Sequence, residues 1–258
     1  MEHLLFEKNG PVARIAFNRP AVFNSMHTAM RREVLEALEL CKQDSEIRVI
    51  YLTGVGKAFC AGQDLQEIVD PEGPELSEIL STGYNPIVAN LRAMPKPVLA
   101  AVNGVAAGAG ANIALACYIT VASETASFTQ AFSKIGLIPD SGGTWTLPRL
   151  VGMQRALGLT FFSDKISAQE AERIGLIWKV LPAETFETDS WKMAETLAAL
   201  PPKALQYTKH TMQAAWHNDF ATQLQLEDQY QTLAGNSEDY QEGVRAFLEK
   251  RKPVFTGR

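Results

Sequence analysis

Three glycine-containing segments hold the residues of this chain that could do chemistry: Phe59–Leu65, Gly108–Ile113 and Ile135–Trp145. Gly108–Ile113 begins like the dinucleotide fingerprint GxGxxG, but Ile113 replaces the third glycine and the loop does not directly follow a strand. A glycine loop that opens a helix still presents free N–H groups and the positive end of the helix dipole, which stabilise a phosphate or an enolate oxyanion. Close helix packing through small residues also explains the loop, and the two explanations are compatible.

The segment Phe59–Leu65 supplies a second candidate backbone donor. Its first three residues have the character of a short strand, which runs directly into Gly62 and Gln63. Open α/β sheets bind ligands outside the carboxyl ends of their strands. Together with the loop at Gly108, this segment gives two free N–H groups, the number that an oxyanion hole typically uses.

Asp140 is the acidic residue of the third segment, and two roles are open to it. It lies between an apolar run and Ser141-Gly-Gly143, where an aspartate commonly caps a helix. Alternatively, the apolar side chains around it could desolvate the carboxylate and raise its pKa, as suits a general base. The candidates for this desolvation are Ile135, Leu137, Ile138 and Trp145.

The composition excludes several classes of protein. The 258 residues include 24 Lys+Arg and 29 Asp+Glu, a net charge of −5 that gives no electrostatic footprint for a nucleic acid or a membrane surface. With 46% apolar and 21% charged residues, the chain is typical of an ordinary globular protein. The signatures of serine hydrolases (GxSxG) and of P-loop NTPases are absent.

Neither a metal site nor a disulfide framework is expected. Cys41, Cys60 and Cys117 lie far apart without a CxxC, and the four histidines include no HExxH pattern. No secretory signal is visible at the N-terminus, so we expect a cytoplasmic protein. The uncharged segment 97–122 is long enough to span a bilayer, but its glycines and the Asn103-Gly104 turn favour a strand, a loop, a helix and a strand.

The pattern along the chain predicts an α/β body, residues 1–185, followed by a helical region, residues 186–258. A hairpin is expected at the start because Asn9-Gly10 separates two apolar runs. The predicted strands are 4–8, 12–17, 49–53, 59–61, 98–102, 119–122 and 177–181. The predicted helices are 26–40, 85–93, 111–117, one from the capping box at Ser167 to Gly175, and 187–200, 203–216, 220–233 and 238–250. The apolar faces of the last four must pack on the body or on a neighbouring subunit.

The three segments, with Pro95–Gly110 and the Asn18-Arg19-Pro20 element, resemble the crotonase (enoyl-CoA hydratase/isomerase) superfamily over essentially the whole chain. The resemblance implies a ClpP/crotonase-like ββα spiral core with a C-terminal helical trimerisation region. It further implies an acyl-CoA thioester substrate, a homotrimer or dimer of trimers, and no cofactor apart from the CoA of the substrate.

The resemblance also assigns roles to individual residues. The N–H groups of Gln63 and Ala109 correspond to the oxyanion hole, although many relatives have glycine at the second position. The two glutamates of the hydratases correspond to Asn112 and Phe132, which cannot act as general bases. Asp140 corresponds to the position where dienoyl-CoA isomerases have a catalytic aspartate, which favours proton transfer by one carboxylate over the addition of water.

Within the superfamily, Gly104–Ala111, Phe132–Asp140 and Asp239–Arg251 are most similar to the isomerases of phenylacetate catabolism, which convert ring-1,2-epoxyphenylacetyl-CoA to oxepin-CoA. A shift of 3-enoyl-CoA to 2-enoyl-CoA double bonds is an expected second activity. Arg19 and the Lys250-Arg251-Lys252 cluster are the candidates for the CoA phosphates. The full set of expected substrate-binding residues is Arg19, Phe23, Ala61, Asp64, Leu65, Gly110, Phe132, Ile138, Trp145 and Lys250.

Other functions within the superfamily remain as alternatives. A general enoyl-CoA isomerase or hydratase of fatty-acid oxidation would share the oxyanion hole. The 4-chlorobenzoyl-CoA dehalogenase uses an aspartate at the position of Asp140, but it also needs a tryptophan where this chain has Phe132. An RNA-binding member of the superfamily would need a basic surface, which the net charge of −5 disfavours.

Overall fold

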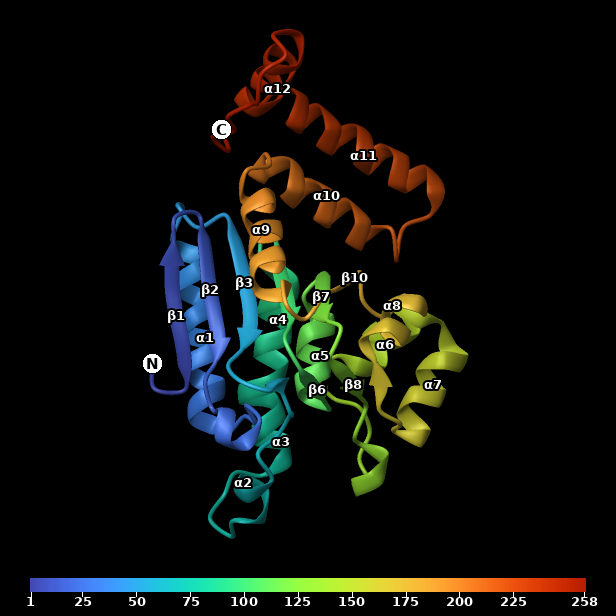
Figure 1. The fold of residues 1–258 in the computed structure, drawn as a ribbon. Helices are drawn as coiled ribbons and strands as arrows, with labels where there is room; N and C mark the ends of the chain where they lie inside the picture. The colour runs from blue at the N-terminus through green and yellow to red at the C-terminus, as the bar shows by residue number, and fades with distance from the viewer.

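Strands of the computed structural model, which describes residues 1–258, form a six-stranded and a four-stranded sheet (Figure 1). The larger sheet has the order β1-β2-β3-β5-β7-β10, and all its neighbours are parallel except β1 and β2. The smaller has the order β4-β6-β8-β9, with β9 antiparallel. The strands are β1 Leu4–Asn9, β2 Val12–Phe17, β3 Val49–Gly54, β4 Ala58–Cys60, β5 Val98–Val102, β6 Val105–Ala107, β7 Ile119–Ser123, β8 Ser127–Thr129, β9 Ile166–Ser167 and β10 Lys179–Leu181.

The helices lie between and after these strands. They are α1 Thr28–Gln43, α2 Leu65–Val69, α3 Leu76–Glu78, α4 Asn85–Ala93, α5 Ala109–Ala116, α6 Gly143–Val151, α7 Met153–Phe162, α8 Ala168–Arg173, α9 Phe186–Ala198, α10 Pro202–Ala214, α11 Phe220–Gly235 and α12 Glu238–Leu248. Short 3₁₀ turns occur at Pro20–Val22 (η1) and Ser133–Ile135 (η3), and a π-helical segment, Ile79–Tyr84 (η2), leads into α4. No helix is both long and apolar enough to cross a membrane.

One unit recurs along the body: a strand of the large sheet, then a strand of the small sheet, then a helix. The successive pairs of strands are β3 and β4, β5 and β6, and β7 and β8, and the first two pairs lead to α4 and α5. The predicted α/β class is therefore confirmed. Each pair turns from one sheet to the other within a few residues, and the short strands β4 and β6 then lead directly into α2 and α5.

Glycines make two of these turns possible. A Cβ atom on Gly54 would lie 2.3 Å from the carbonyl oxygen of Ala58, and one on Gly104 would lie 2.2 Å from that of Lys57. The Asn103 side chain joins the two turns, because its Oδ1 accepts the Gly54 N–H at 3.1 Å and its Nδ2 donates to the Gly56 carbonyl at 2.9 Å. The backbones of neighbouring units thus touch directly, and no larger residue would fit.

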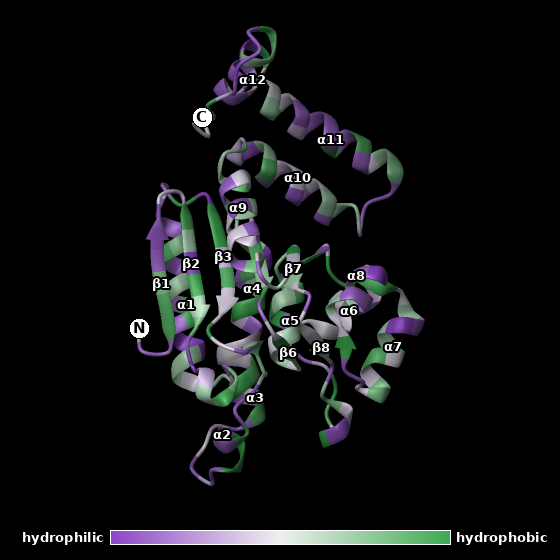
Figure 2. Cartoon of the chain, viewed as in Figure 1, coloured by the Kyte–Doolittle hydropathy of each residue, from purple (hydrophilic) through white to green (hydrophobic).

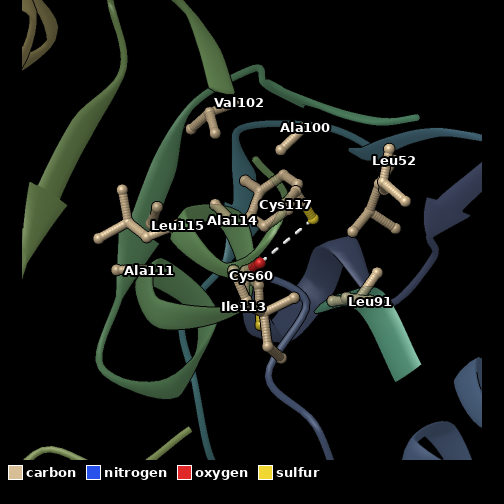
Figure 3. Close-up of a cluster of buried hydrophobic side chains, with 14 of the residues drawn as sticks. Leu52, Cys60, Leu91, Ala100, Val102, Ala111, Ile113, Ala114, Leu115 and Cys117 are labelled. Atoms are coloured by element: carbon tan, nitrogen blue, oxygen red, sulfur yellow. Dashed lines mark hydrogen bonds between the residues drawn. The ribbon is translucent and has the colours of Figure 1, made fainter. Parts of the chain in front are cut away.

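The helix α5 is the centre of the core (Figure 3), and all eight of its residues are buried. Ile113 and Leu115 lie among Leu52, Leu91 and Val102 from the surrounding strands and from α4, within one continuous apolar cluster. The Cys117 thiol donates to the Ile113 carbonyl at 3.3 Å, and burial raises its pKa far above the ordinary value. Burial likewise raises the pKa of Cys60 to about 12, so both cysteines are packing residues, as predicted.

The helical region begins where the strand pattern ends, but its first helix packs on the body. Phe186 and Ala194 of α9 lie in a second apolar cluster with Val12 and other residues of the large sheet, and the Tyr51 hydroxyl is 2.8 Å from that of Ser190. The helices α10–α12 then project away from the sheets (Figure 1). The helix α11 buries no side chain, and both polar and apolar residues cover α11 and α12 (Figure 2).

Candidate active site

The two glycine loops lie against each other at the carboxyl ends of β4 and β6. Gly62 has a φ of +95°, and a Cβ atom there would lie 2.9 Å from the Ala107 carbonyl oxygen and 3.4 Å from the Ala109 nitrogen. On the other side of this contact, a Cβ atom on Gly110 would lie 2.3 Å from the Cys60 carbonyl oxygen. Backbone therefore packs on backbone, which is why both positions require glycine.

The N–H groups of Gln63 and Ala109 are free at this contact. Neither donates a hydrogen bond within the chain. Ala109 is the first residue of α5, so its N–H has no partner within the helix and lies at the positive end of the dipole. Gly108 precedes it with a φ of +52° and a ψ of −128°, a conformation that favours glycine. The two predicted donors are thus adjacent and available to an anion.

The side chain of Gln63 is held by a small network, so its N–H keeps a fixed direction. Its Oε1 accepts from Arg31 Nη1 at 2.8 Å, and its Nε2 donates to Glu67 Oε2 at 2.8 Å. The Met26 backbone brackets Gln63, since its N–H donates to Gly62 and its carbonyl accepts from Asp64. Burial opposes ionisation of Glu67, but hydrogen bonds from Thr28, Gln63 and Arg31 prevail and lower its pKa to about 2. Glu67 is therefore a poor base.

Arg19 fastens the other end of the same loop. Its Nη1 pairs with Asp64 Oδ2 at 2.8 Å and donates to the Ser25 carbonyl at 2.6 Å. Asp64 in turn caps α2 by accepting from the Gln66 N–H at 3.1 Å. Arg19 and Asp64, both predicted to contact the substrate, thus hold the loop that carries the Gln63 donor.

The remaining predicted residues of this loop lie around it. The Phe23 backbone is left-handed, with a φ of 53°, and its carbonyl accepts the Ala61 N–H at 2.9 Å. The Phe23 ring is half exposed, and so is Leu65 at the start of α2. Ala61, Phe23 and Leu65 therefore form one edge of the site beside Gln63.

Asp140 is held through its backbone carbonyl, and its carboxylate accepts one side-chain hydrogen bond. Asn112, at a hydratase glutamate position, donates from Nδ2 to the Asp140 carbonyl at 2.9 Å, and its Oδ1 accepts from Gln130 Nε2 at 2.9 Å. Ser141 has a left-handed φ of +50°, and its hydroxyl donates to Asp140 Oδ1 at 2.8 Å. Strained residues of this kind often occur at functional sites.

The helix-cap role of Asp140 is wrong. The next helix, α6, begins at Gly143, its cap residue is Gly142, and no side chain caps it. The Asp140 carbonyl, and not the carboxylate, accepts the Gly143 N–H at 2.8 Å. Two extra residues between Asp140 and the helix thus move the carboxylate out of the capping position.

Burial is the main influence on the Asp140 carboxylate. Desolvation raises its pKa above the ordinary value of 3.8, although the hydrogen bonds from Ser141 and its own backbone act in the opposite direction. The residue takes part in no ion pair. A half-buried carboxylate with a raised pKa and no cationic partner suits a group that accepts and returns a proton.

The raised pKa has an expected kinetic consequence. Because the base must be ionised, kcat/KM for an acyl-CoA isomerisation should fall as the pH drops through the Asp140 pKa, so the acid limb should lie above pH 3.8. A pH–rate profile between pH 4 and pH 8 measures this limb. A flat profile down to pH 4 would contradict the assignment.

Phe132 and Ile138 lie on two sides of the Asp140 segment. The buried Phe132 ring is 3.8 Å from where a Cβ atom on Gly108 would be, so it borders the oxyanion loop. Ile138 is exposed and lines an apolar pocket of about 380 Å³ between η3, α6 and α7. These positions are compatible with the predicted contacts to an acyl group.

Two predicted site residues lie elsewhere. The Trp145 ring is stacked between the guanidinium groups of Arg92 and Arg149, at 4.2 and 4.0 Å, because its place in the first turn of α6 directs it toward α4. Lys250 follows α12, which lies well away from the start of α5 within one chain (Figure 1). Neither residue contributes to this site within one chain.

Sequence reasoning missed Tyr84, the last residue of η2. Its hydroxyl is buried without any hydrogen-bond partner, and Arg31 lies 5.3 Å from the ring centroid. Burial, and to a smaller extent the nearby Cys60 and Asp140, raises its pKa well above 10, although Arg31 acts in the opposite direction. The π-helical turn that carries it is a feature often found at functional sites, but it has no clear pattern in the sequence.

Comparison with known proteins shows to which family this chain belongs. The model of the family described as enoyl-CoA hydratase/isomerase matches residues 7–258. The Escherichia coli K12 protein named 1,2-epoxyphenylacetyl-CoA isomerase is 46% identical, with all of both chains covered. A Rhodobacter capsulatus protein named "Probable enoyl-CoA hydratase" is 47% identical, over 98% of this chain and 97% of its own.

A solved structure agrees with these matches. The crystal structure of an enoyl-CoA hydratase from Bacillus anthracis has a TM-score of 0.91 at 34% identity, and covers 99% of this chain and 100% of its own. The crotonase core expected from the motifs is therefore confirmed, as is the expectation that the chain is an enzyme. With its family-model match, its relatives and its fold in agreement, the chain belongs to the enoyl-CoA hydratase/isomerase family.

Proposed function

We propose that this enzyme is an acyl-CoA isomerase that converts ring-1,2-epoxyphenylacetyl-CoA to oxepin-CoA and also shifts 3-enoyl-CoA double bonds to position 2. The observation that carries the proposal is the single available carboxylate. Asp140 has a raised pKa, and its backbone is bound to Asn112 in the first turn of α5, the helix whose first residue, Ala109, has a free N–H. Asn112 and Phe132 correspond to the hydratase glutamates. One carboxylate can move a proton, whereas the glutamate pair of a hydratase must also activate water.

In the mechanism Asp140 acts first as a general base and then as a general acid. The carboxylate removes a proton from the carbon next to the thioester, and the electron pair left behind forms an enolate whose oxygen accepts from the Gln63 and Ala109 N–H groups. For a 3-enoyl-CoA, protonated Asp140 returns the proton to C4 as the dienolate collapses, so the double bond moves from C3–C4 to C2–C3. For the epoxide, the ring carbon–carbon bond shared with the epoxide breaks as the seven-membered oxepin ring forms, and the proton returns to a ring carbon. The raised pKa of Asp140 makes the carboxylate a stronger base for the first, uphill transfer. No cofactor is needed for these steps.

Two observations support an oxygenated acyl group. The chain is 46% identical to a protein named for epoxyphenylacetyl-CoA isomerisation. The buried Tyr84 hydroxyl also lacks a partner, and a buried polar group of this kind is costly unless something bonds to it. An oxygen on the ring of the substrate would supply that partner, whereas a purely aliphatic acyl chain would not.

The decisive experiment is a turnover assay with enzymatically generated ring-1,2-epoxyphenylacetyl-CoA. The purified enzyme should form oxepin-CoA, detected as a chromatographic shift at unchanged mass, and should add no water to trans-2-enoyl-CoA thioesters. Efficient hydration with no conversion of the epoxide would support a general enoyl-CoA hydratase instead.

Tyr84→Phe tests the substrate preference of the same site. We expect kcat/KM for the epoxide to fall about tenfold, as for the loss of one neutral hydrogen bond, with cis-3-hexenoyl-CoA affected less than about twofold. Tyr51→Phe is the matched control, because this buried hydroxyl bonds to Ser190 and lies under α9. An equal loss on both substrates would show that the Tyr84 hydroxyl supports the fold and does not contact the ring oxygen.

The projecting helices support assembly as a homotrimer or a dimer of trimers. Phe220 of α11 is 79% exposed and Phe247 of α12 is 83% exposed, which is unfavourable for side chains that face water. A neighbouring subunit would cover them and would bring Lys250 near another chain's site. In this proposal Lys250 and Lys252 contact the CoA phosphates, since Arg19 is already paired with Asp64.

A further inference from the structure

Six side chains form a continuous stack of cations and aromatic rings where α4, α5, α6 and α10 meet. This cation–aromatic stack consists of Arg92, Tyr118, Trp145, Arg149, Lys209 and Trp216. The guanidinium of Arg92 lies 4.6 Å from the Tyr118 centroid and 4.2 Å from that of Trp145. Three positive charges are thus collected within one partly buried cluster.

No acidic side chain neutralises these charges. None of the ion pairs in the chain includes Arg92, Arg149 or Lys209. Burial, and then the charge of Arg92, lowers the pKa of Lys209 to about 8, while burial and Arg149 both act to lower that of Arg92. The cations therefore repel one another, and no acidic side chain pairs with them to offset the repulsion.

The hydrogen-bond donors of the cluster are also largely unused. A guanidinium has five N–H donors, yet the Arg92 side chain makes no hydrogen bond, and that of Arg149 makes one, from Nη1 to the Trp145 carbonyl at 3.0 Å. Arg149 Nε is buried without any acceptor. Lys209 donates to the Met94 carbonyl at the end of α4. Contacts with the rings orient these cations and leave most guanidinium N–H groups without an acceptor in the chain, of which Arg149 Nε is buried.

We propose that the cation–aromatic stack is a binding site for an oxyanion, a carboxylate or a phosphate, that accepts from Arg92 and Arg149. A guanidinium presents paired donors that match either group. A pocket of about 360 Å³ adjoins the stack and is lined by Tyr118, Lys209 and Trp216 among others. Arg92 and Arg149 do not line this pocket themselves, but their guanidinium groups stack on two rings that do, Tyr118 at 4.6 Å and Trp216 at 5.5 Å.

This site is separate from the one that binds the thioester. The oxyanion hole uses the first residue of α5, whereas Tyr118 follows the last, and the eight residues between extend about 12 Å. The oxyanion has two possible sources: a free anion, or an acidic side chain of a second copy of this chain. Both satisfy the same donors, and the following experiment distinguishes them.

The test compares the wild type with Arg92→Gln and with Arg92→Met, which keeps an apolar stem over Tyr118. Arg155→Gln is the matched control, because Arg155 is exposed, on α7 and in no ion pair. Thermal shift is recorded against inorganic phosphate at constant ionic strength, and assembly is followed by sedimentation velocity. Asp140→Asn should show the same Tm shift with phosphate and the same assembly as the wild type. The result for the cation–aromatic stack is therefore independent of the result for the active site.

Two outcomes support the proposal and one overturns it. For a free anion, phosphate raises the Tm of the wild type and of Arg155→Gln, and the Arg92 variants need at least tenfold more phosphate. If the oxyanion is a carboxylate of a second copy, phosphate has little effect on the Tm. The oligomers of the Arg92 variants then dissociate at protein concentrations at least tenfold higher than those of the wild type. If both folded Arg92 variants match the wild type in phosphate response and in assembly, the stack binds no oxyanion.

Discussion

Replacing Asp140 with asparagine is expected to lower kcat for isomerisation of cis-3-hexenoyl-CoA by about 10³-fold, within the range for a positioned general acid–base group. The amide cannot accept the proton, whereas the Asn112 contact to the backbone carbonyl keeps the segment in place. Affinity for a non-reactive acyl-CoA should change less than about threefold, because the oxyanion hole is intact. Stopped assays and calorimetric titration measure the two quantities.

The same variant has an expected effect on stability. The pKa of Asp140 is higher in the folded state than in the unfolded state. The folded state therefore loses stability as the pH rises through these two pKa values, and the ionised carboxylate destabilises the fold at pH 7. Asp140→Asn should therefore raise the Tm at pH 7, with the gain shrinking toward pH 4. Asp164→Asn, on the surface, is the control and should change neither rate nor Tm. Turnover near the wild-type level would exclude Asp140 as the proton carrier.

Ala109→Pro is expected to reduce kcat by about 10²- to 10³-fold, the cost of one oxyanion-hole donor. Proline is tolerated at the first position of a helix, where its missing N–H would have no partner in any case. The substitution thus removes the donor while α5 keeps its hydrogen bonds. The pH dependence should keep its acid limb, because Asp140 is unchanged, and this separates loss of the oxyanion hole from loss of the base.

A generic effect of proline needs its own control. Phe220→Pro places proline at the first position of α11, whose N–H also makes no hydrogen bond in the chain. Phe220→Pro is a control for folding only, and circular dichroism of both variants should match the wild type. If folded Ala109→Pro retained more than about a tenth of the activity, Ala109 would be excluded as a donor of the oxyanion hole.

Local patterns predicted the elements of the body well. The helix at 85–93 and the strand at 98–102 were predicted with the observed bounds, because Pro95-Lys-Pro97 stops one and the next apolar run is short and uninterrupted. Both candidate backbone donors, Gln63 and Ala109, could be selected because glycine loops have a clear signature, and the N–H groups of both are free. The helices α6 and α7 were missed, since Pro148 and the glycines at 152 and 158 interrupt their pattern.

Local patterns could not predict the small sheet or the side-chain contacts between distant helices. Its strands have only two or three residues, too few to show a period, and their partners are far apart in sequence. Trp145 was predicted to line the acyl site because an aromatic residue near a catalytic aspartate is a natural candidate. Its stacking on Arg92 depends on how α4 and α6 meet, which no local pattern encodes.

The contact between Asn112 and the Asp140 backbone limits how this enzyme could change its chemistry. A Cβ atom on Gly143 would lie 2.3 Å from Asn112 Nδ2, so the space around the amide is already filled. A glutamate at position 112 would need a further methylene there and would lose the donor that holds Asp140. If the proposed function is correct, gaining a hydratase glutamate at position 112 would require a compensating substitution at Gly143 and another donor for the Asp140 carbonyl.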